Sequence, residues 1–156
     1  YISFTFIKLF FYQNSNEVVL IESERLIIRV WKKEDSEEFF FLNSDPEVMF
    51  YFPSVLTRED SDEFLQKIIT RINHDGYGFW PVEEKTTRKF IGFIGINFSR
   101  VGLDIKPCVE IGWRLKKEFW GKGISIEAIK TITNINCIIA QILSNPDSNL
   151  RYSKFR

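Results

Sequence analysis

The stretch from Glu110 to Ala128 constrains the fold of this chain most, because it has the pattern of a strand, a tight glycine loop and a helix start. The expected strand ends in a short basic linker, after which Gly121 and Gly123 flank Lys122. Glycine permits positive φ and close approach of a ligand to the backbone. Amides of the loop and of the first helical turn would converge where the helix dipole adds positive potential. The stretch predicts a phosphate or pyrophosphate site, although a glycine turn that only reverses the chain has the same pattern.

Charge and cysteine usage limit the classes of function. Lys and Arg total 21, as do Asp and Glu, so no net charge draws the chain onto nucleic acid. No apolar run approaches the length of a membrane span. Cys108 and Cys137 lie far apart without metal-ligand spacing, and the single His74, expected near a helix end, builds no metal cluster. We therefore expect a cytoplasmic protein with reduced thiols, no metal site, and neither nucleic acid nor a membrane as partner.

Periodicity along the 156 residues predicts one folded unit with alternating strands and helices. Short turns between consecutive strands favour antiparallel pairing. The order of elements predicts an α/β (α+β) fold with a mixed, largely antiparallel central sheet flanked by helices. The expected strands span 20–30, 78–84, 89–98, 108–115 and 137–143, and the expected helices span 35–42, 57–76 and 125–133.

The strand expected at 108–115 divides its side chains between two faces. Gly92 and Gly95 in the strand before it predict a bulge or a close backbone contact. The first face carries Cys108, Glu110, Gly112 and Arg114, and the second carries Val109, Ile111, Trp113 and Leu115.

Two aromatic stretches lie in the first half of the chain. Residues 49–53, Met-Phe-Tyr-Phe-Pro, suit the apolar lining of a binding cleft and suit a plain core equally well. The run Phe39–Phe41 favours a place in the core.

A family resemblance sharpens the prediction of an anion site. The segment Glu-Ile-Gly-Trp-Arg-Leu at 110–115, followed by Phe-Trp-Gly-Lys-Gly-Ile-x-x-Glu-Ala at 119–128, resembles the acetyl-CoA-binding motif of the GNAT superfamily of N-acetyltransferases. The nearest likeness is to the branch that acetylates the N-termini of ribosomal proteins (RimJ/RimL-like). The resemblance runs from about Glu22 to the C-terminus. It implies the acyl-CoA N-acyltransferase fold, acetyl-CoA as cofactor, and a primary amine of a protein N-terminus or small molecule as acceptor.

The resemblance also assigns cofactor-binding residues. In the family the glycine loop holds the CoA pyrophosphate, and the strand before it pairs with the pantetheine arm. A later segment, Asn-x-x-Ser-x-x-x-Tyr-x-Lys at 145–154, resembles the start of a family helix that contacts pantetheine or its phosphates. Carried over to this sequence, the cofactor-binding residues are Trp113, Arg114, Leu115, Trp120, Gly121, Lys122, Gly123, Ile124, Asn145 and Ser148. Residues 49–53 fall in the region that lines the acceptor pocket in the family.

Glu110 and Tyr152 are the candidates for proton transfer. Glu110 lies on the expected cofactor strand, where family members commonly carry a carboxylate, and partial desolvation would bring its pKa nearer to working pH for a general base. The alternative is a solvated or ion-paired carboxylate. Tyr152 stands where many members carry the tyrosine that protonates the CoA thiolate; the alternative is an aromatic side chain in a frayed C-terminus.

The two ends of the chain raise separate expectations. Tyr1–Tyr12 is apolar and begins without Met, so we expect residues 1–19 to be an extra segment ahead of an acetyltransferase domain at 20–156. The family continues with further strands, so the fold is expected to be incomplete at the C-terminus. An open edge on 137–143 then predicts weak activity and either a homodimer or coverage by the N-terminal segment. A non-catalytic acyl-CoA-binding module and a degenerate truncated acetyltransferase are the alternative functions.

Overall fold

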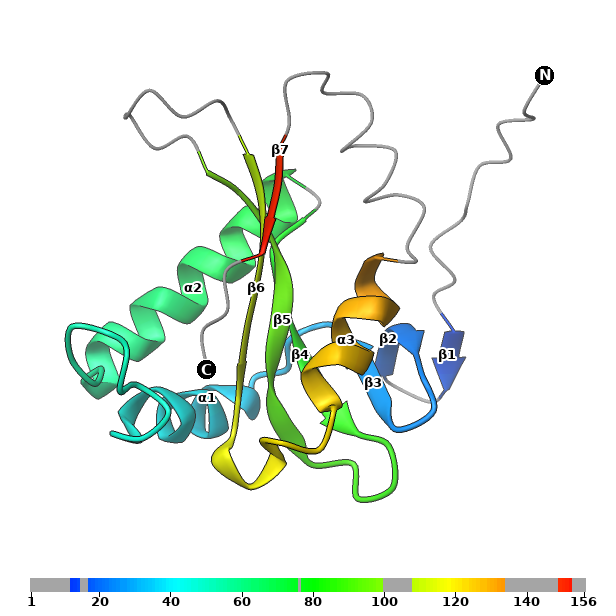
Figure 1. The fold of residues 1–156 in the computed structure, drawn as a ribbon, viewed down its shortest axis with the longest axis horizontal. Coiled ribbons are helices and arrows are strands. Elements are labelled where there is room, and N and C mark those ends of the chain that lie inside the picture. The colour runs from blue at the N-terminus through cyan, green and yellow to red at the C-terminus, as the bar shows by residue number, and fades with distance from the viewer. Residues whose placement is uncertain (1–11, 15–16, 76, 100–107, 134–148, 153–156) are drawn as a thin grey trace.

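The computed structural model describes residues 12–14, 17–75, 77–99, 108–133 and 149–152. In this part of the chain the strands form one sheet in the order β1-β2-β3-β4-β5-β6-β7 (Figure 1). Neighbouring strands from β1 to β6 are antiparallel, and β6 and β7 are parallel. The predicted mixed, largely antiparallel sheet is confirmed. Its strands are β1 (Tyr12–Asn14), β2 (Glu17–Glu22), β3 (Leu26–Arg29), β4 (Phe79–Glu84), β5 (Phe90–Ser99), β6 (Cys108–Leu115) and β7 (Asn149–Tyr152), and the helices are α1 (Asp35–Ser44), α2 (Arg58–Asp75), the 3₁₀ turn η1 (Lys117–Phe119) and α3 (Ile124–Thr133).

Helices cover both faces of the sheet, with α1 and α2 on one face and α3 on the other (Figure 1). Under α3, Ile124 and Ile132 pack with Ile94 of the sheet. On the other face Phe39 of α1 packs with Phe93 of β5. α2 and α3 are held by burial of an apolar stripe, whereas the buried face of α1 combines Phe39 and Leu42 with the polar Asp35 and Asn43. Among the described helices, none combines the length and apolarity that crossing a bilayer requires.

Helix α2 begins and ends close to the predicted residues. Thr57 Oγ1 accepts a hydrogen bond from the Asp60 N–H at 3.2 Å, as an N-cap residue does. Leu65 and Ile68 are buried on the predicted stripe. The helix ends at Asp75, with His74 in its last turn, and Gly76 lies outside the described residues.

The run Phe39–Phe41 is only partly core. Phe39 is fully buried, whereas Phe41 is 53% exposed. Residues two apart on a helix lie on nearly opposite sides, so α1 cannot bury both. The expectation that the whole run is core is therefore wrong for Phe41.

The strand expected at 20–30 is two strands joined by a turn. β2 and β3 pair with each other in antiparallel register. The turn between them closes with a hydrogen bond from the Ser23 N–H to the Leu26 carbonyl at 2.9 Å, and the Ser23 hydroxyl accepts from the Leu26 N–H at 3.1 Å. β2 begins at Glu17, before residue 20, where the acetyltransferase domain was expected to start, and it pairs with β1. Both strands therefore belong to the same sheet.

The segment expected to start a helix at 145 contains strand β7 instead. β7 pairs in parallel with β6, placing Asn149 opposite Cys108 and Tyr152 opposite Ile111. The physical reason is the edge of β6, whose N–H and C=O groups need partners that a helix would not supply. The strand expected at 137–143, with Cys137, lies outside the described residues, as do Asn145 and Ser148.

The two glycines of β5 have the close contacts predicted for them. A Cβ on Gly92, whose φ is +150°, would lie 2.1 Å from the Arg114 carbonyl oxygen. A Cβ on Gly95 would lie 1.8 Å from the Gly78 carbonyl oxygen. Only glycine allows these approaches: Gly92 lets β6 lie close to β5, and Gly95 lets the backbone at the start of β4 do so.

Candidate active site

The glycine loop between β6 and α3 has the predicted backbone. Gly121 and Gly123 have φ of +71° and +75°, the left-handed region that glycine adopts without strain. At this end of α3 the Glu127 N–H donates to the Gly123 carbonyl at 3.1 Å. The N–H groups of the preceding residues have no helical partner. A Cβ on Gly121 would meet nothing within 4 Å, so space for a ligand lies directly over the loop.

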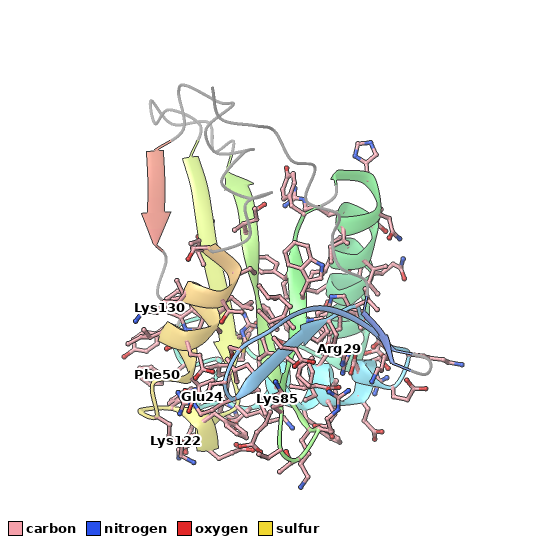
Figure 2. All side chains as sticks on the ribbon, turned by 90° about the vertical axis from the view of Figure 1, so that its right-hand side faces the viewer. Glu24, Arg29, Phe50, Lys85, Lys122 and Lys130 are labelled. Atoms are coloured by element: carbon pink, nitrogen blue, oxygen red, sulfur yellow. The ribbon has the colours of Figure 1, made fainter. Side chains whose placement is uncertain are left out.

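The loop is held by a cluster that sequence reasoning missed. Glu127 of α3 accepts hydrogen bonds from the Ser23 hydroxyl at 2.6 Å and from Arg25 Nε at 2.6 Å. Arg25 Nη1 also donates to the Lys122 carbonyl at 3.0 Å. Figure 2 labels Glu24 and Lys122 on the two turns that meet here. The turn between β2 and β3 therefore fixes the backbone of the loop.

The charge of Glu127 is stabilised by these contacts. Burial alone would raise its pKa, but hydrogen bonds from Ser23 and Arg25, with the positive charge of Arg25, hold the pKa of Glu127 below its ordinary value. Glu127 is therefore ionised at neutral pH. The motif at 119–128 includes Glu127, but the sequence did not indicate its role, because its partners Ser23 and Arg25 lie about a hundred residues away.

Trp120 ties the loop to the end of β6. Its indole Nε1 donates to the Leu115 carbonyl at 2.8 Å, and its ring packs against both hydrophobic cores. Leu115 is buried under α3, and Trp113 packs partly buried against the same core. These contacts indicate a structural role for the side chains of Trp113, Leu115 and Trp120.

Glu110 and Arg114 line one small cavity on the α1–α2 side of the sheet. The cavity has a volume of about 230 Å³, and Phe52, Phe93 and Asn97 form part of its wall. Glu110 is half-buried and makes no ion pair with a described residue. Of the stretch 49–53, Phe52 lines the cavity, whereas Met49 is core and Phe50 and Tyr51 are exposed. Met49 is thus core as one interpretation has it, and the role of Phe52 in a binding cleft stays a prediction.

The Arg114 side chain is buried on the same side. It is 6% exposed, and its Nη1 donates to the Oδ1 of Asn43 in α1. Its guanidinium lies over the Phe52 ring at 4.1 Å and the Phe93 ring at 5.4 Å, while no described residue hydrogen-bonds with Nε. Burial lowers the pKa of Arg114 to about 10. The glycine loop leads into α3, which packs on the opposite face of the sheet from the Arg114 side chain. Only the backbone of Arg114 is therefore a candidate for contact with a cofactor at the loop.

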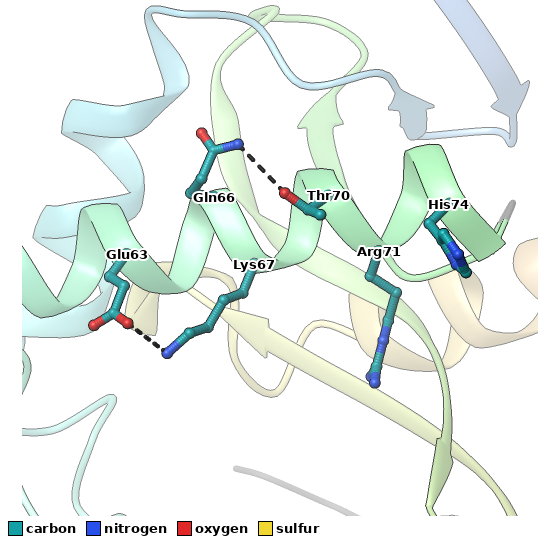
Figure 3. Close-up of a pocket in the computed structure, with 6 residues that line it drawn as sticks. All are labelled: Glu63, Gln66, Lys67, Thr70, Arg71 and His74. Atoms are coloured by element: carbon teal, nitrogen blue, oxygen red, sulfur yellow. Dashed lines mark hydrogen bonds and ion pairs between the residues drawn. The ribbon is translucent and has the colours of Figure 1, made fainter.

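A second hollow lies along the outer face of α2 (Figure 3). It measures about 510 Å³, and one helix supplies its lining. Glu63 pairs with Lys67 at 2.7 Å, and Gln66 Nε2 donates to Thr70 Oγ1 at 3.4 Å. Arg71 reaches away to the Oδ1 of Asn97, a residue of the first cavity. The hollow brings together no set of groups for catalysis.

Residues 25–138 match the family described as acetyltransferase (GNAT) domain. The chain therefore belongs to the GNAT acetyltransferase family. It is 27% identical over 118 residues to the Bacillus subtilis protein YkkB, whose function is uncharacterised, and the match covers 74% of this chain and 66% of that relative. The aligned part is thus slightly less than two thirds of the relative.

Solved structures have the same fold. A GNAT-family acetyltransferase from Bacillus anthracis matches with a TM-score of 0.55 and 28% identity, over 71% of this chain and 61% of that one. The microcin C7 self-immunity acetyltransferase MccE, solved in complex with acetyl-CoA and AMP, matches with a TM-score of 0.55 and 19% identity, over 83% of this chain and 69% of that one. The second likeness shows the fold alone.

Proposed function

We propose that this protein is an acetyl-CoA-dependent N-acetyltransferase that acts on a primary amine bound in the Glu110 cavity. The observation that carries the proposal is the open loop with two left-handed glycines at the start of α3, in a chain of the GNAT family. Acetyl-CoA, when bound, supplies the acetyl group as a thioester. MccE, which has this fold, binds acetyl-CoA in its solved structure.

The residues present fit this cofactor. Amides of the loop from Gly121 to Ile124 would bind the pyrophosphate, because they combine unpaired N–H groups with the positive end of the helix dipole. β7 pairs only with Cys108–Ile111, so in the described part of the chain β6 has no strand partner on that edge from Gly112 to Leu115. This free edge would pair with the pantetheine arm through the backbone of Trp113, Arg114 and Leu115.

Glu110 is the proposed general base. An amine attacks a carbonyl carbon only after its ammonium form loses a proton, and a carboxylate that lines the acceptor cavity can accept that proton. Tyr152 remains the predicted proton donor. The register of β7 places its backbone opposite Ile111, the residue after Glu110.

Calorimetric titration with acetyl-CoA tests the cofactor site. Gly123→Asp adds a Cβ at a left-handed position and a negative charge beside the expected phosphates, and we expect at least a tenfold loss of affinity. Gln66→Glu adds the same charge on α2, across the sheet, and should bind acetyl-CoA like the parent. Equal affinity of Gly123→Asp and parent would show that the loop is not the phosphate site.

A further inference from the structure

Arg114 is a buried cation for which the described part of the chain supplies no counter-ion. Among the described residues its one hydrogen-bond partner is the neutral amide oxygen of Asn43, which is fully buried. Asn43 in turn donates from Nδ2 to the Ser61 hydroxyl at 3.4 Å. The groups that orient the guanidinium are thus uncharged, and they leave its positive charge uncompensated.

An uncompensated charge in a protein interior is costly unless something pairs with it. The faces of Phe52 and Phe93 offset part of this cost through cation–π contact. A guanidinium carries five N–H donors; here Nη1 donates to Asn43, whereas the buried Nε finds no partner among the described residues. Arg114 therefore retains both charge and donor capacity for a further anionic partner.

The cavity beside Arg114 has opposite charges at its two ends. Glu110 and Arg114 lie four residues apart on one face of β6, so their Cα atoms are about 13 Å apart. Gly112 lies between them without a side chain, and a Cβ there would sit 3.0 Å from the Phe79 ring. The middle of the cavity is thus apolar, and no ion pair joins Glu110 to Arg114.

We propose that Arg114 determines acceptor specificity by binding a carboxylate of the acceptor, which is a small primary amine that also carries an acid group. The inference rests on the proposed function, since Glu110 is taken to meet the amine end. The cavity, at about 230 Å³, is smaller than the roughly 300–1,000 Å³ of pockets for drug-sized ligands. An amine and a carboxylate separated by a short apolar chain match its negative end, apolar middle and positive end in that order.

The test uses ω-amino acids of three to six carbons, each paired with its primary amide, which has the same size and no charge. Calorimetry measures binding, and release of the CoA thiol from acetyl-CoA measures turnover. We expect at least one acid to bind about tenfold or more tightly than its amide, because a charge-assisted hydrogen bond is lost in the amide. Arg114→Gln should bring that ratio to about one.

Asn43→Asp provides a second variant in case Arg114→Gln does not fold. It keeps Arg114 and places a carboxylate against the guanidinium, so the protein should melt at a higher temperature than the parent while the acid-to-amide ratio falls to about one. A purely structural Arg114 would give the stabilisation without any change in that ratio.

Three results would overturn the inference: acid and amide bind equally at every length, the preference survives both variants, or neither ligand binds. The turnover assay distinguishes these from failure of the proposed function. Equal turnover of acid and amide sustains the acetyltransferase and rejects the role of Arg114. An acid preference in binding that depends on Arg114, without thiol release, sustains the anion site and rejects the acetyltransferase.

Discussion

Arg29 and Arg114 are both buried in strands of the same sheet, but their surroundings differ. Arg29 in β3 is 2% exposed and is bound by two carboxylates: Asp35 accepts from Nη1 and Nη2 at 2.7 Å each, and Glu83 accepts from Nε. Arg114 in β6 is 6% exposed and has a neutral amide and two aromatic rings. Figure 2 labels Arg29 on β3, one of the strands of the sheet interior.

The electrostatic outcomes are opposite. Burial would lower the pKa of Arg29, but hydrogen bonds and the charges of Asp35 and Glu83 raise it above its ordinary value. Burial lowers the pKa of Arg114 to about 10 with no carboxylate to oppose it. Removing a buried cation from the carboxylates around it leaves their charges buried and uncompensated. For a buried cation without a counter-ion among the described residues, we propose instead that a ligand completes the set.

The largest effect is expected at Arg29. Arg29→Met leaves Asp35 buried without its cation and leaves Glu83 with only the longer pairs to Lys32 and Arg88, so the free energy of unfolding in urea should fall by about 3–5 kcal/mol. Arg58→Met is the control, because Arg58 is about half exposed in its 2.9 Å pair with Asp62 and should cost about 1 kcal/mol or less. If Arg29→Met lowered the free energy of unfolding no more than Arg58→Met, the structural role assigned to Arg29 would be wrong.

Glu110→Gln contrasts a carboxylate of the cavity with the carboxylates that bind Arg29. The substitution keeps the size and removes the base, so kcat should fall by about 10²-fold or more while the melting temperature stays close to that of the parent. Glu83→Gln should do the reverse, lowering stability more than rate. Steady-state kinetics across pH would contradict the assignment if Glu110→Gln kept the rate and pH profile of the parent.

Arg114→Met should cost less stability than Arg29→Met. It leaves a buried Asn43 oxygen unpaired and removes the cation–π contacts, but it strands no charge, so we expect a loss of about 1–2 kcal/mol in urea unfolding. A loss as large as that of Arg29→Met would mean that Arg114 is a structural residue, and the comparison between the two arginines would collapse.

The smallest effect concerns Glu127, the carboxylate that holds the glycine loop. Because its folded-state pKa is lowered, its stabilising contribution is complete above the unfolded value of about 4.3 and is lost as pH falls through the folded value. Glu127→Gln should therefore lower the melting temperature at pH 7, by the equivalent of about 1 kcal/mol, and converge on the parent as pH falls below the lowered folded-state pKa of Glu127. A difference that persists at low pH would assign the effect to packing rather than to charge.

Local signals in the sequence were sufficient for much of the fold and for the loop. The glycines of the loop, the alternation in β6 and the cap of α2 act within a few residues, and the structure has all three. The fold class followed from the order of these elements. β7 was missed because strand pairing depends on a partner about forty residues away, and the sequence pattern resembled a helix start.

The polar half of the site could not be predicted in the same way. Arg25 and Glu127 are 102 residues apart, and Arg114 and Asn43 are 71 apart. Arg114 and Glu127 belong to the motif, but no local pattern in the sequence indicates that their side chains pair with Asn43 and Arg25. Alternation places Glu110 and Arg114 on one face, but it does not say which charged residue will be buried or whether a counter-ion will reach it.

Thiol release tests the central claim most directly. Protein, acetyl-CoA and an amine are mixed, free CoA thiol is followed with time, and the acetylated amine is quantified by mass spectrometry. The account predicts enzyme-dependent release of one thiol for each amine acetylated, and loss of that release in Gly123→Asp. Tight binding of acetyl-CoA without thiol release for any amine, ω-amino acids included, would contradict it and identify a non-catalytic acyl-CoA-binding protein.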